Sequence, residues 1–162
     1  MIKLRKLFAV GMIYLLVGCG GTSSVTYSYT DSMTLPADMI GSTADIEIKG
    51  NEKMTLYYEG DSVEKINDSI EYTFETDVTA DDKEIVKGLL LDSFDTDEKG
   101  VNVEDKSTDE KIVVSVDVNL KEVDKEADII AMFNMYASDF KEDGTYPLET
   151  LQNTLTEAGY EK

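Results

Sequence analysis

The chain has 162 residues, of which 34 are acidic and 15 are basic, and its formal net charge is −19. Phosphate groups repel such a charge, which argues against nucleic acid as a partner. There is no His, and Cys19 is the one Cys, so an internal disulfide, a cysteine–histidine zinc site and a Ser–His nucleophile are excluded.

Residues 1–18 have the form of an export signal. Residues 1–6 carry three basic side chains, and residues 7–17 (LFAVGMIYLLV) form an apolar run of 11 residues. A membrane-spanning helix needs about 20 apolar residues, so this run has the length of a signal core rather than of a permanent anchor. Residues 1–18 contain three of the basic residues and no acidic ones, so residues 19–162 carry 12 basic and 34 acidic side chains, a formal charge of −22.

The signal ends in Leu16, Val17, Gly18 and Cys19, a tetrad that resembles the bacterial lipobox. The Cys19 sulfur is the nucleophile that would receive a diacylglyceryl group, and cleavage would follow between Gly18 and Cys19. An ordinary signal peptide that happens to contain a Cys is the alternative, and the spacing favours the lipoprotein. We therefore expect attachment to the outer side of the cell membrane by two or three acyl chains on Cys19, which together hold a protein stably.

Residues 19–44 are expected to form a flexible linker between this lipid and one domain over residues 45–162. The linker is rich in Gly, Ser, Thr and Asp, which is typical of a tether. The alternation of Val25, Tyr27 and Tyr29 leaves an edge strand there as the alternative.

An antiparallel meander is predicted over residues 45–75. Met54 and Leu56 alternate with polar neighbours, as in a strand with one buried face. The pairs Gly50–Asn51 and Gly60–Asp61 are candidates for the tight turns that join such strands.

Residues 80–98 predict a helix with Thr79 as its cap, and residues 101–120 predict strand structure. The clearest strand signal is a set of aliphatic residues at every second position, which indicates a strand with a buried face. These residues are Ile112, Val114, Val116, Val118 and Leu120.

Two further helices are predicted near the end of the chain. Residues 125–135 suit a short helix, and residues 147–158 suit a final helix that begins at Pro147 and is capped by Gly159. The expected fold is therefore α+β, an antiparallel sheet of about four or five strands with two or three helices packed on one face.

Four stretches resemble the YehR-like lipoproteins of bacteria. They are the lipobox at Cys19, residues 54–63 (MTLYYEGDSV), residues 112–120 and the ending Gly159–Tyr160. The similarity covers most of residues 45–162, whereas residues 20–44 are longer than the usual lead-in of the family. The resemblance implies a lipid-anchored α+β domain of unestablished role, and it implies nothing about catalysis.

Acidic clusters are the first candidate sites. An oxygen-rich group that could hold Ca²⁺ consists of Asp92, Asp95, Asp97 and Glu98. The D-x-D-x-D-G spacing of a calcium loop is missing, which favours a solvated helix end. Asp77, Asp81 and Asp82 are better explained as helix N-terminal acids, and we expect no bound metal or cofactor.

Aromatic and apolar stretches are the other candidates. A ligand platform could form from Tyr57, Tyr58, Tyr72 and Phe74. A groove for a partner or an acyl chain could form from Met132, Phe133, Met135, Tyr136 and Phe140. Ordinary packing is favoured in both cases.

These patterns favour a non-enzymatic envelope lipoprotein that binds an unknown protein or small-molecule ligand. Two alternatives remain open. One is a carboxylate-dependent cell-wall hydrolase, which needs two acidic side chains converging in a cleft with one pKa raised. The other is a calcium-binding surface protein.

Overall fold

The structure is a computed structural model that describes residues 21–75, 78–94 and 97–162. The predicted signal peptide, its lipobox from Leu16 to Cys19, Asp77 and Asp95 lie outside these residues. None of the helices in the described ranges is long and apolar enough to cross a membrane.

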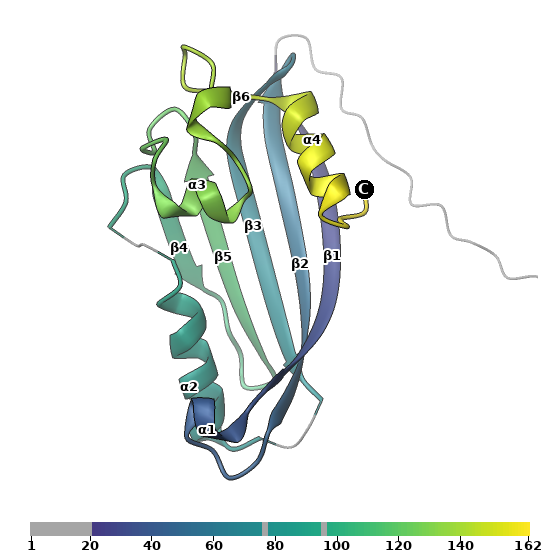
Figure 1. Cartoon of the computed structure of the whole chain (residues 1–162), viewed down its shortest axis with the longest axis vertical. Helices are drawn as coiled ribbons and strands as arrows, with labels where there is room; N and C mark the ends of the chain where they lie inside the picture. The colour runs from purple at the N-terminus through teal and green to yellow at the C-terminus, as the bar shows by residue number, and fades with distance from the viewer. Residues whose placement is uncertain (1–20, 76–77, 95–96) are drawn as a thin grey trace, which may run out of the picture.

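The described residues form one antiparallel sheet with helices on one of its faces (Figure 1). The strands are β1 (Ser23–Leu35), β2 (Ile46–Glu59), β3 (Ser62–Phe74), β4 (Val101–Asp105), β5 (Lys111–Asn119) and β6 (Tyr146–Pro147). Their spatial order is β1-β2-β3-β5-β4, and the short β6 pairs with β3. The α+β class is thus confirmed, with a sheet somewhat larger than predicted.

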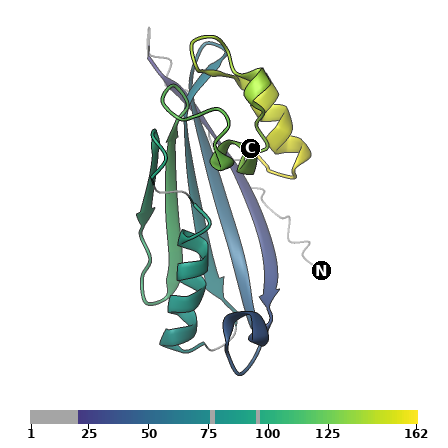
Figure 2. The same ribbon diagram turned by 60° about the vertical axis from the view of Figure 1, so that its left-hand side comes forward.

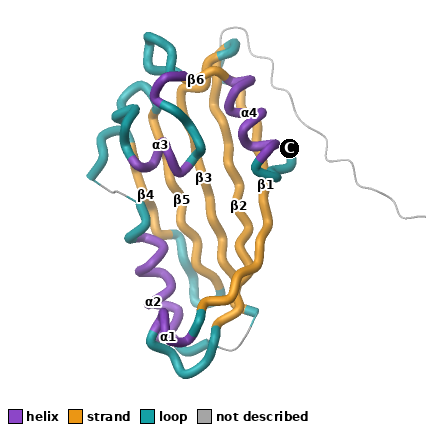
Figure 3. Tube along the Cα trace, in the orientation of Figure 1, coloured by secondary structure: helices purple, strands orange, loops and turns teal. Residues whose placement is uncertain are grey.

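The helices are α1 (Ala37–Ile40), α2 (Ala80–Leu91), α3 (Asp128–Met132) and α4 (Leu148–Glu157), with a short 3₁₀ turn at Ala137–Asp139. Figure 2 shows that they lie on one face of the sheet, called here the inner face. Figure 3 shows that α3 and α4 lie toward one end of this face, whereas α1 and α2 lie toward the other.

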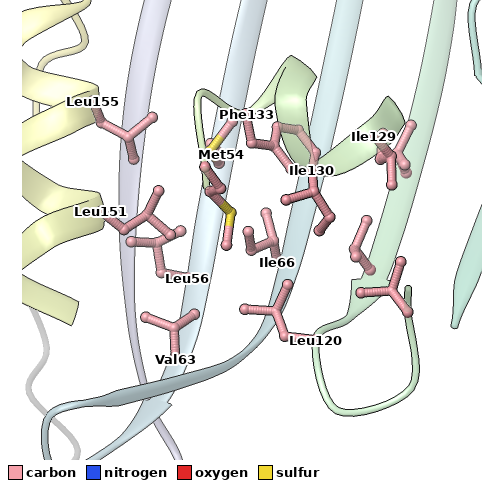
Figure 4. Packing of buried hydrophobic residues seen from close by; sticks show 14 of the residues in the cluster. Met54, Leu56, Val63, Ile66, Leu120, Ile129, Ile130, Phe133, Leu151 and Leu155 are labelled. Atoms are coloured by element: carbon pink, nitrogen blue, oxygen red, sulfur yellow. The ribbon is translucent and has the colours of Figure 1, made fainter. Parts of the chain in front are cut away.

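The main core lies between the inner face and α3 and α4. Leu151 of α4 packs beside Leu56 of β2, and Ile130 of α3 faces Ile66 of β3 (Figure 4). All four side chains are fully buried. Burying an aliphatic side chain of this size contributes about 1.5–3 kcal/mol, so the close-packed layer accounts for much of the stability.

β5 has the burial that its sequence predicts. Its aliphatic residues at every second position are buried, and the strand is paired on both sides, with β3 and with β4. The turn at Gly60–Asp61 is confirmed as well, because it joins β2 to β3 with Gly60 at a φ of 59°.

The flexible linker predicted over residues 19–44 is wrong for most of its length. Residues 23–35 form β1, which pairs with β2 along its whole length, and the alternative of a strand at residues 25–29 is confirmed. The physical reason is the alternation itself. Tyr27 is buried on the inner face and pairs with Met54, and this burial outweighs the turn-like composition of the segment.

The predicted turn at Gly50–Asn51 is also wrong, since β2 runs through both residues. The glycine at position 50 instead allows a neighbouring ring to pack against the strand. A Cβ atom there would lie 3.1 Å from Cε1 of Tyr72, so the missing side chain makes room for the Tyr72 ring on the neighbouring strand.

The helix predicted over residues 80–98 is real but ends at Leu91. Its cap at Thr79 is confirmed, because the Asp82 backbone N–H donates to the Thr79 hydroxyl at 3.1 Å and the Thr79 backbone N–H donates to Asp82 at 3.2 Å. The chain leaves the helix to bury Phe94 in the core. The expected apolar face is therefore incomplete, and Leu89 remains largely exposed.

The two helices predicted near the end of the chain are both present. The one expected over residues 125–135 is shorter, at Asp128–Met132, and the final helix spans Leu148–Glu157 with Pro147 just before it. Gly159 follows α4 at a φ of 93°, which is the left-handed conformation that ends a helix.

Candidate functional site

A hollow of about 110 Å³ opens on the inner face between the two groups of helices. We call it the inner-face hollow. Its lining residues are Tyr29, Asp31 and Met33 of β1, Gly50 and Glu52 of β2, and Ile70 and Tyr72 of β3. None of the described helices crosses the middle of β1 and β2 (Figure 1).

Strand register brings these residues together in rows. Tyr29 pairs with Glu52, which in turn pairs with Ile70. Asp31 pairs with Gly50, and Gly50 pairs with Tyr72, in the next row. Because side chains at every second position share a face, three neighbouring strands point all of these side chains into one place.

The segment after α4 lies against two residues that line the hollow, Tyr29 and Glu52. Gly159 turns the chain after α4, and Tyr160 then lies back against the sheet, with its ring 5.2 Å from that of Tyr29. Two backbone hydrogen bonds between Ser28 and Glu161, of 2.7 and 2.9 Å, hold this segment on the edge of β1. The arrangement places the Tyr160 hydroxyl over β2.

The Tyr160 hydroxyl donates a short hydrogen bond to Oε1 of Glu52. Glu52 is half-buried and is one of the two acidic residues that line the hollow, the other being the exposed Asp31. Burial and the nearby Glu52 charge raise the pKa of both Tyr160 and Tyr72, so both phenols keep their protons at neutral pH. Tyr160 therefore acts as a permanent donor to Glu52.

Asp68 of β3 lies next to Glu52 on the same face and is only 2% exposed. Its Oδ1 atom is buried without a hydrogen-bond donor among the described residues. Desolvation, the negative charge of Glu52 and a hydrogen bond with Glu52 raise the pKa of Asp68 to about 8. At neutral pH Asp68 is thus protonated and donates to Glu52, and the two carboxyl groups share one negative charge.

Of the larger hollows elsewhere on the described surface, two lie beside α2. One of about 460 Å³ lies between α2 and the β4–β5 connection, where Lys83 donates to the Asp109 carbonyl and Lys87 pairs with Glu84. The other, of about 490 Å³, is lined by residues including Asp92 and lies between the end of α2 and the start of α3. Their polar groups are exposed or paired, so the smaller inner-face hollow has the more unusual chemistry.

The calcium cluster is only partly covered by the structure, because Asp95 lies outside the described residues. Among the residues that are described, no group of three or more possible metal ligands lies close enough to hold an ion. Glu98 accepts a hydrogen bond of 3.2 Å from the Asp124 backbone N–H. Calcium binding by this cluster stays a prediction.

The aromatic residues singled out in the sequence do not form one platform. Tyr58, Tyr72 and Phe74 pack against the core, whereas Lys65 lies over the Tyr57 ring at 5.7 Å. Tyr72 alone of the four lines the inner-face hollow.

The apolar stretch at residues 132–140 mainly fills the core. Phe133 and Met135 are buried, and Phe140 packs edge-on against Tyr146 with their ring centres 5.2 Å apart. Met132 and Tyr136 are exposed at 47% and 66%. Core packing, the favoured interpretation, therefore holds for most of the stretch.

The sequence analysis missed Glu52, Asp68 and Tyr160 as members of one site. Two of them could have been identified from the alternation of inward- and outward-facing positions along the strands. Asp68 lies between Ile66 and Ile70 at a position that should face the core, and Glu52 has the same phase relative to Met54. The hydrogen bond between Glu52 and Tyr160 depends on the path of the chain after α4.

No family model matches this sequence, and no curated protein matches it. A search of solved structures finds the NMR structure of the E. coli YehR protein, with a TM-score of 0.53 over 83% of this chain and 91% of that chain. The chain has a YehR-like fold. The two sequences are 19% identical over this match, so the likeness to YehR confirms the resemblance at the level of the fold.

Proposed function

We propose that this chain is a lipid-anchored envelope protein that binds a small ligand in the inner-face hollow and catalyses no reaction. The observation that carries the ligand site is the buried Asp68 carboxyl, which has an oxygen without a donor and lies against Glu52. The lipobox ending at Cys19 supports the anchor.

Stability alone gives no reason for this carboxyl pair. Placing a carboxyl group in the interior costs free energy, and a well-packed apolar residue at the same position is often neutral or stabilising. Carboxyl groups with strongly shifted pKa values gather at functional sites for this reason. Asp68 occupies an inward position between aliphatic neighbours, and a binding role for the pair explains its presence there.

A ligand would reach the pair through Glu52, which lines the hollow from the middle of β2. Tyr160 holds Glu52 from one side, and Asp68 holds it from within the sheet. The carboxylate is therefore fixed in position before a ligand arrives, and a fixed polar group in an aromatic-lined hollow is the usual form of a small-molecule site.

The ligand proposal is tested by asking what purifies with the chain. The full chain and its Gly50→Val variant would be purified from membranes in detergent, and the small molecules they release compared by mass spectrometry. Valine at this position would crowd the Tyr72 ring and fill the hollow. We expect at least one molecule that accompanies the unaltered chain and is lost from the variant.

Gly88→Ala is the matched control for that comparison, because a Cβ atom at Gly88 would meet nothing within 4 Å. This control should keep the accompanying molecule. Identical small-molecule profiles for the unaltered chain and Gly50→Val would contradict a ligand site in the hollow.

The anchor is tested separately by intact-mass measurement of the chain extracted from membranes. The expected mass is that of residues 19–162 with a diacylglyceryl group on Cys19, with or without an additional acyl chain on its amine. An unmodified thiol at Cys19, or a leader still attached, would contradict the anchor. A Cys19→Ser variant should fail to be processed by this route.

A carboxylate-dependent hydrolase is the second candidate, because Glu52 and Asp68 converge and the pKa of one of them is raised. Their spacing argues against the glycosidase form of this chemistry. The two groups share a hydrogen bond, whereas glycosidase carboxyl groups stand about 5–9 Å apart with the substrate between them. Release of soluble fragments from purified cell wall, lost in Glu52→Gln, would favour the hydrolase over the binding protein.

A further inference from the structure

We infer that the inner-face hollow binds the primary ammonium group of a small aliphatic amine, with Glu52 as its ionic partner and the rings of Tyr29 and Tyr72 against its carbon chain and charge. This inference rests on the proposed function and names the chemistry of its ligand. It follows from the charge, the rings, the free hydrogen-bond acceptors and the size of the hollow.

The acidic residues around the hollow determine which charge a ligand must carry. Two of the seven residues that line the hollow, Asp31 and Glu52, are acidic, and none of the seven is basic. Asp68 adds a further carboxyl group directly behind Glu52. An anionic ligand would be repelled there, whereas a cation would compensate the negative charge that the carboxyl pair carries in a low-dielectric setting.

The rings favour an organic cation. Tyr29 and Tyr72 line the hollow from either side of β2, since both strands that carry them pair with β2. The face of a tyrosine ring attracts an ammonium group by about 0.5–2 kcal/mol, more when the contact is shielded from water. A bare metal ion is disfavoured, because no cluster of three possible ligands occurs within the described ranges.

The acceptors favour an ammonium over a guanidinium group. The Glu52 carboxylate already accepts hydrogen bonds from the Tyr160 hydroxyl, at Oε1, and from Asp68. Part of its accepting capacity is therefore occupied, and two free oxygens are not available to the parallel donors of a guanidinium group. A guanidinium group binds a carboxylate best through two parallel hydrogen bonds, whereas an ammonium is a compact charge that one oxygen can satisfy.

The size of the hollow limits the ligand to a small group. A buried cavity of about 150 Å³ holds benzene, which has six carbon atoms. The hollow of about 110 Å³ then has room for about four or five non-hydrogen atoms, by the same proportion. That matches a short alkylamine, or the amino end of a longer molecule whose remainder extends into solvent past Met33.

The test is a calorimetric titration of the full chain in detergent with n-butylamine. Butan-1-ol and butyrate serve as probes of similar shape that are neutral and anionic. We expect the amine to bind at least tenfold more tightly than either of them. Equal affinity for the alcohol or for butyrate would overturn the amine assignment.

Variants locate the binding. Glu52→Gln keeps the acceptor for Tyr160 but removes the charge, and it should weaken butylamine binding at least tenfold. Asp31→Asn, which removes the charge of an exposed residue and keeps an oxygen for the Ser32 backbone N–H, should weaken it by a few-fold. The matched control is Glu59→Gln, which removes the same charge from an exposed site at the end of β2 and should leave the affinity unchanged.

The same titration separates failure of this inference from failure of the proposed function. Binding of butan-1-ol or butyrate that Gly50→Val abolishes would keep the hollow as a ligand site and reject the amine. Butylamine affinity that is the same in Glu52→Gln, Asp31→Asn and the unaltered chain would reject the assignment to this hollow. Absence of binding by all three probes would reject the inference, and the co-purification experiment would then decide the proposed function.

Discussion

The Tyr160 hydroxyl hydrogen-bonds to Glu52, a residue 108 positions earlier, and this contact ties the end of the chain to the middle of the sheet. It forms because Gly159 ends α4 in a left-handed conformation and directs Tyr160 back across the strands. Leu155 supports the turn, since its carbonyl accepts the Tyr160 backbone N–H at 2.9 Å. The segment after α4 is therefore fixed against the sheet next to Glu52, one of the residues that line the inner-face hollow.

Removing that hydroxyl should destabilise the fold. Tyr160→Phe leaves the ring in place but deprives the half-buried Glu52 carboxylate of a donor, which costs about 1–3 kcal/mol. Urea unfolding followed by circular dichroism measures the change. Tyr136→Phe is the control, because the Tyr136 side chain is largely exposed. Equal stabilities of Tyr160→Phe and the unaltered chain would show that the contact contributes nothing.

Asp68 should make stability fall as the pH rises. The folded-state pKa of Asp68 is about 8, above the usual value of 3.8, so the folded chain holds a proton that the unfolded chain releases. The contribution of this proton to the free energy of unfolding is greatest below about pH 4. It declines toward pH 8 and is fully lost above it. The ionisable groups that face Asp68 are Glu52, Tyr72 and Tyr160.

Asp68→Asn is the variant that isolates this effect, since an amide can donate to Glu52 at every pH. Urea midpoints measured at pH 5, 6, 7 and 8 should decline less steeply for the variant than for the unaltered chain. Acids with lowered pKa values, such as Asp61 and Asp143, are exposed and lose their contribution only near pH 4 or below, outside this window. If the urea midpoint declined with pH equally steeply in both chains, Asp68 would not be a buried, protonated carboxyl group.

Amine binding should release a proton near neutral pH. An ammonium group beside Glu52 favours the ionised form of Asp68 and lowers its pKa from about 8. The heat of butylamine binding at pH 7 should therefore differ between HEPES and phosphate buffers, which take up a proton with different enthalpies and contain no primary amine. In Asp68→Asn the two buffers should give the same heat, and a persistent difference would assign the proton to another group.

Gly88→Ala should stabilise the chain. Gly88 lies within α2, and a Cβ atom there would meet nothing within 4 Å. Alanine in a helix interior is favoured over glycine by about 0.5–1 kcal/mol, mainly because the unfolded chain loses freedom. Thermal unfolding followed by circular dichroism checks the gain. A lower melting temperature would contradict this expectation.

Much of the fold follows from local patterns in the sequence. The alternation in β5, the cap at Thr79 and the Gly60–Asp61 turn each reflect a short-range rule, and each is found where the sequence predicts it. β1 was harder to predict, because its alternating residues lie among Ser, Thr and Asp. Its burial comes from pairing with β2, and pairing is not a property of the segment alone.

The candidate site was beyond prediction for a related reason. Glu52 and Asp68 are two of 34 acidic residues, and nothing local separates them from the others. What separates them is their inward phase on neighbouring strands and the return of Tyr160 to the sheet. Both depend on strand register and on the path of the chain, which the spacing of residues does not determine.

Selective labelling of tyrosine rings tests the central claim most directly, because the chain has tyrosines both in and away from the hollow. NMR spectra of the full chain in detergent would be recorded with butylamine, butan-1-ol and butyrate in turn. The account predicts that butylamine shifts the ring signals of Tyr29 and Tyr72 and leaves those of Tyr57 and Tyr136 in place. If butylamine moves neither Tyr29 nor Tyr72, or if all four rings shift alike, the inner-face hollow does not bind the ammonium group.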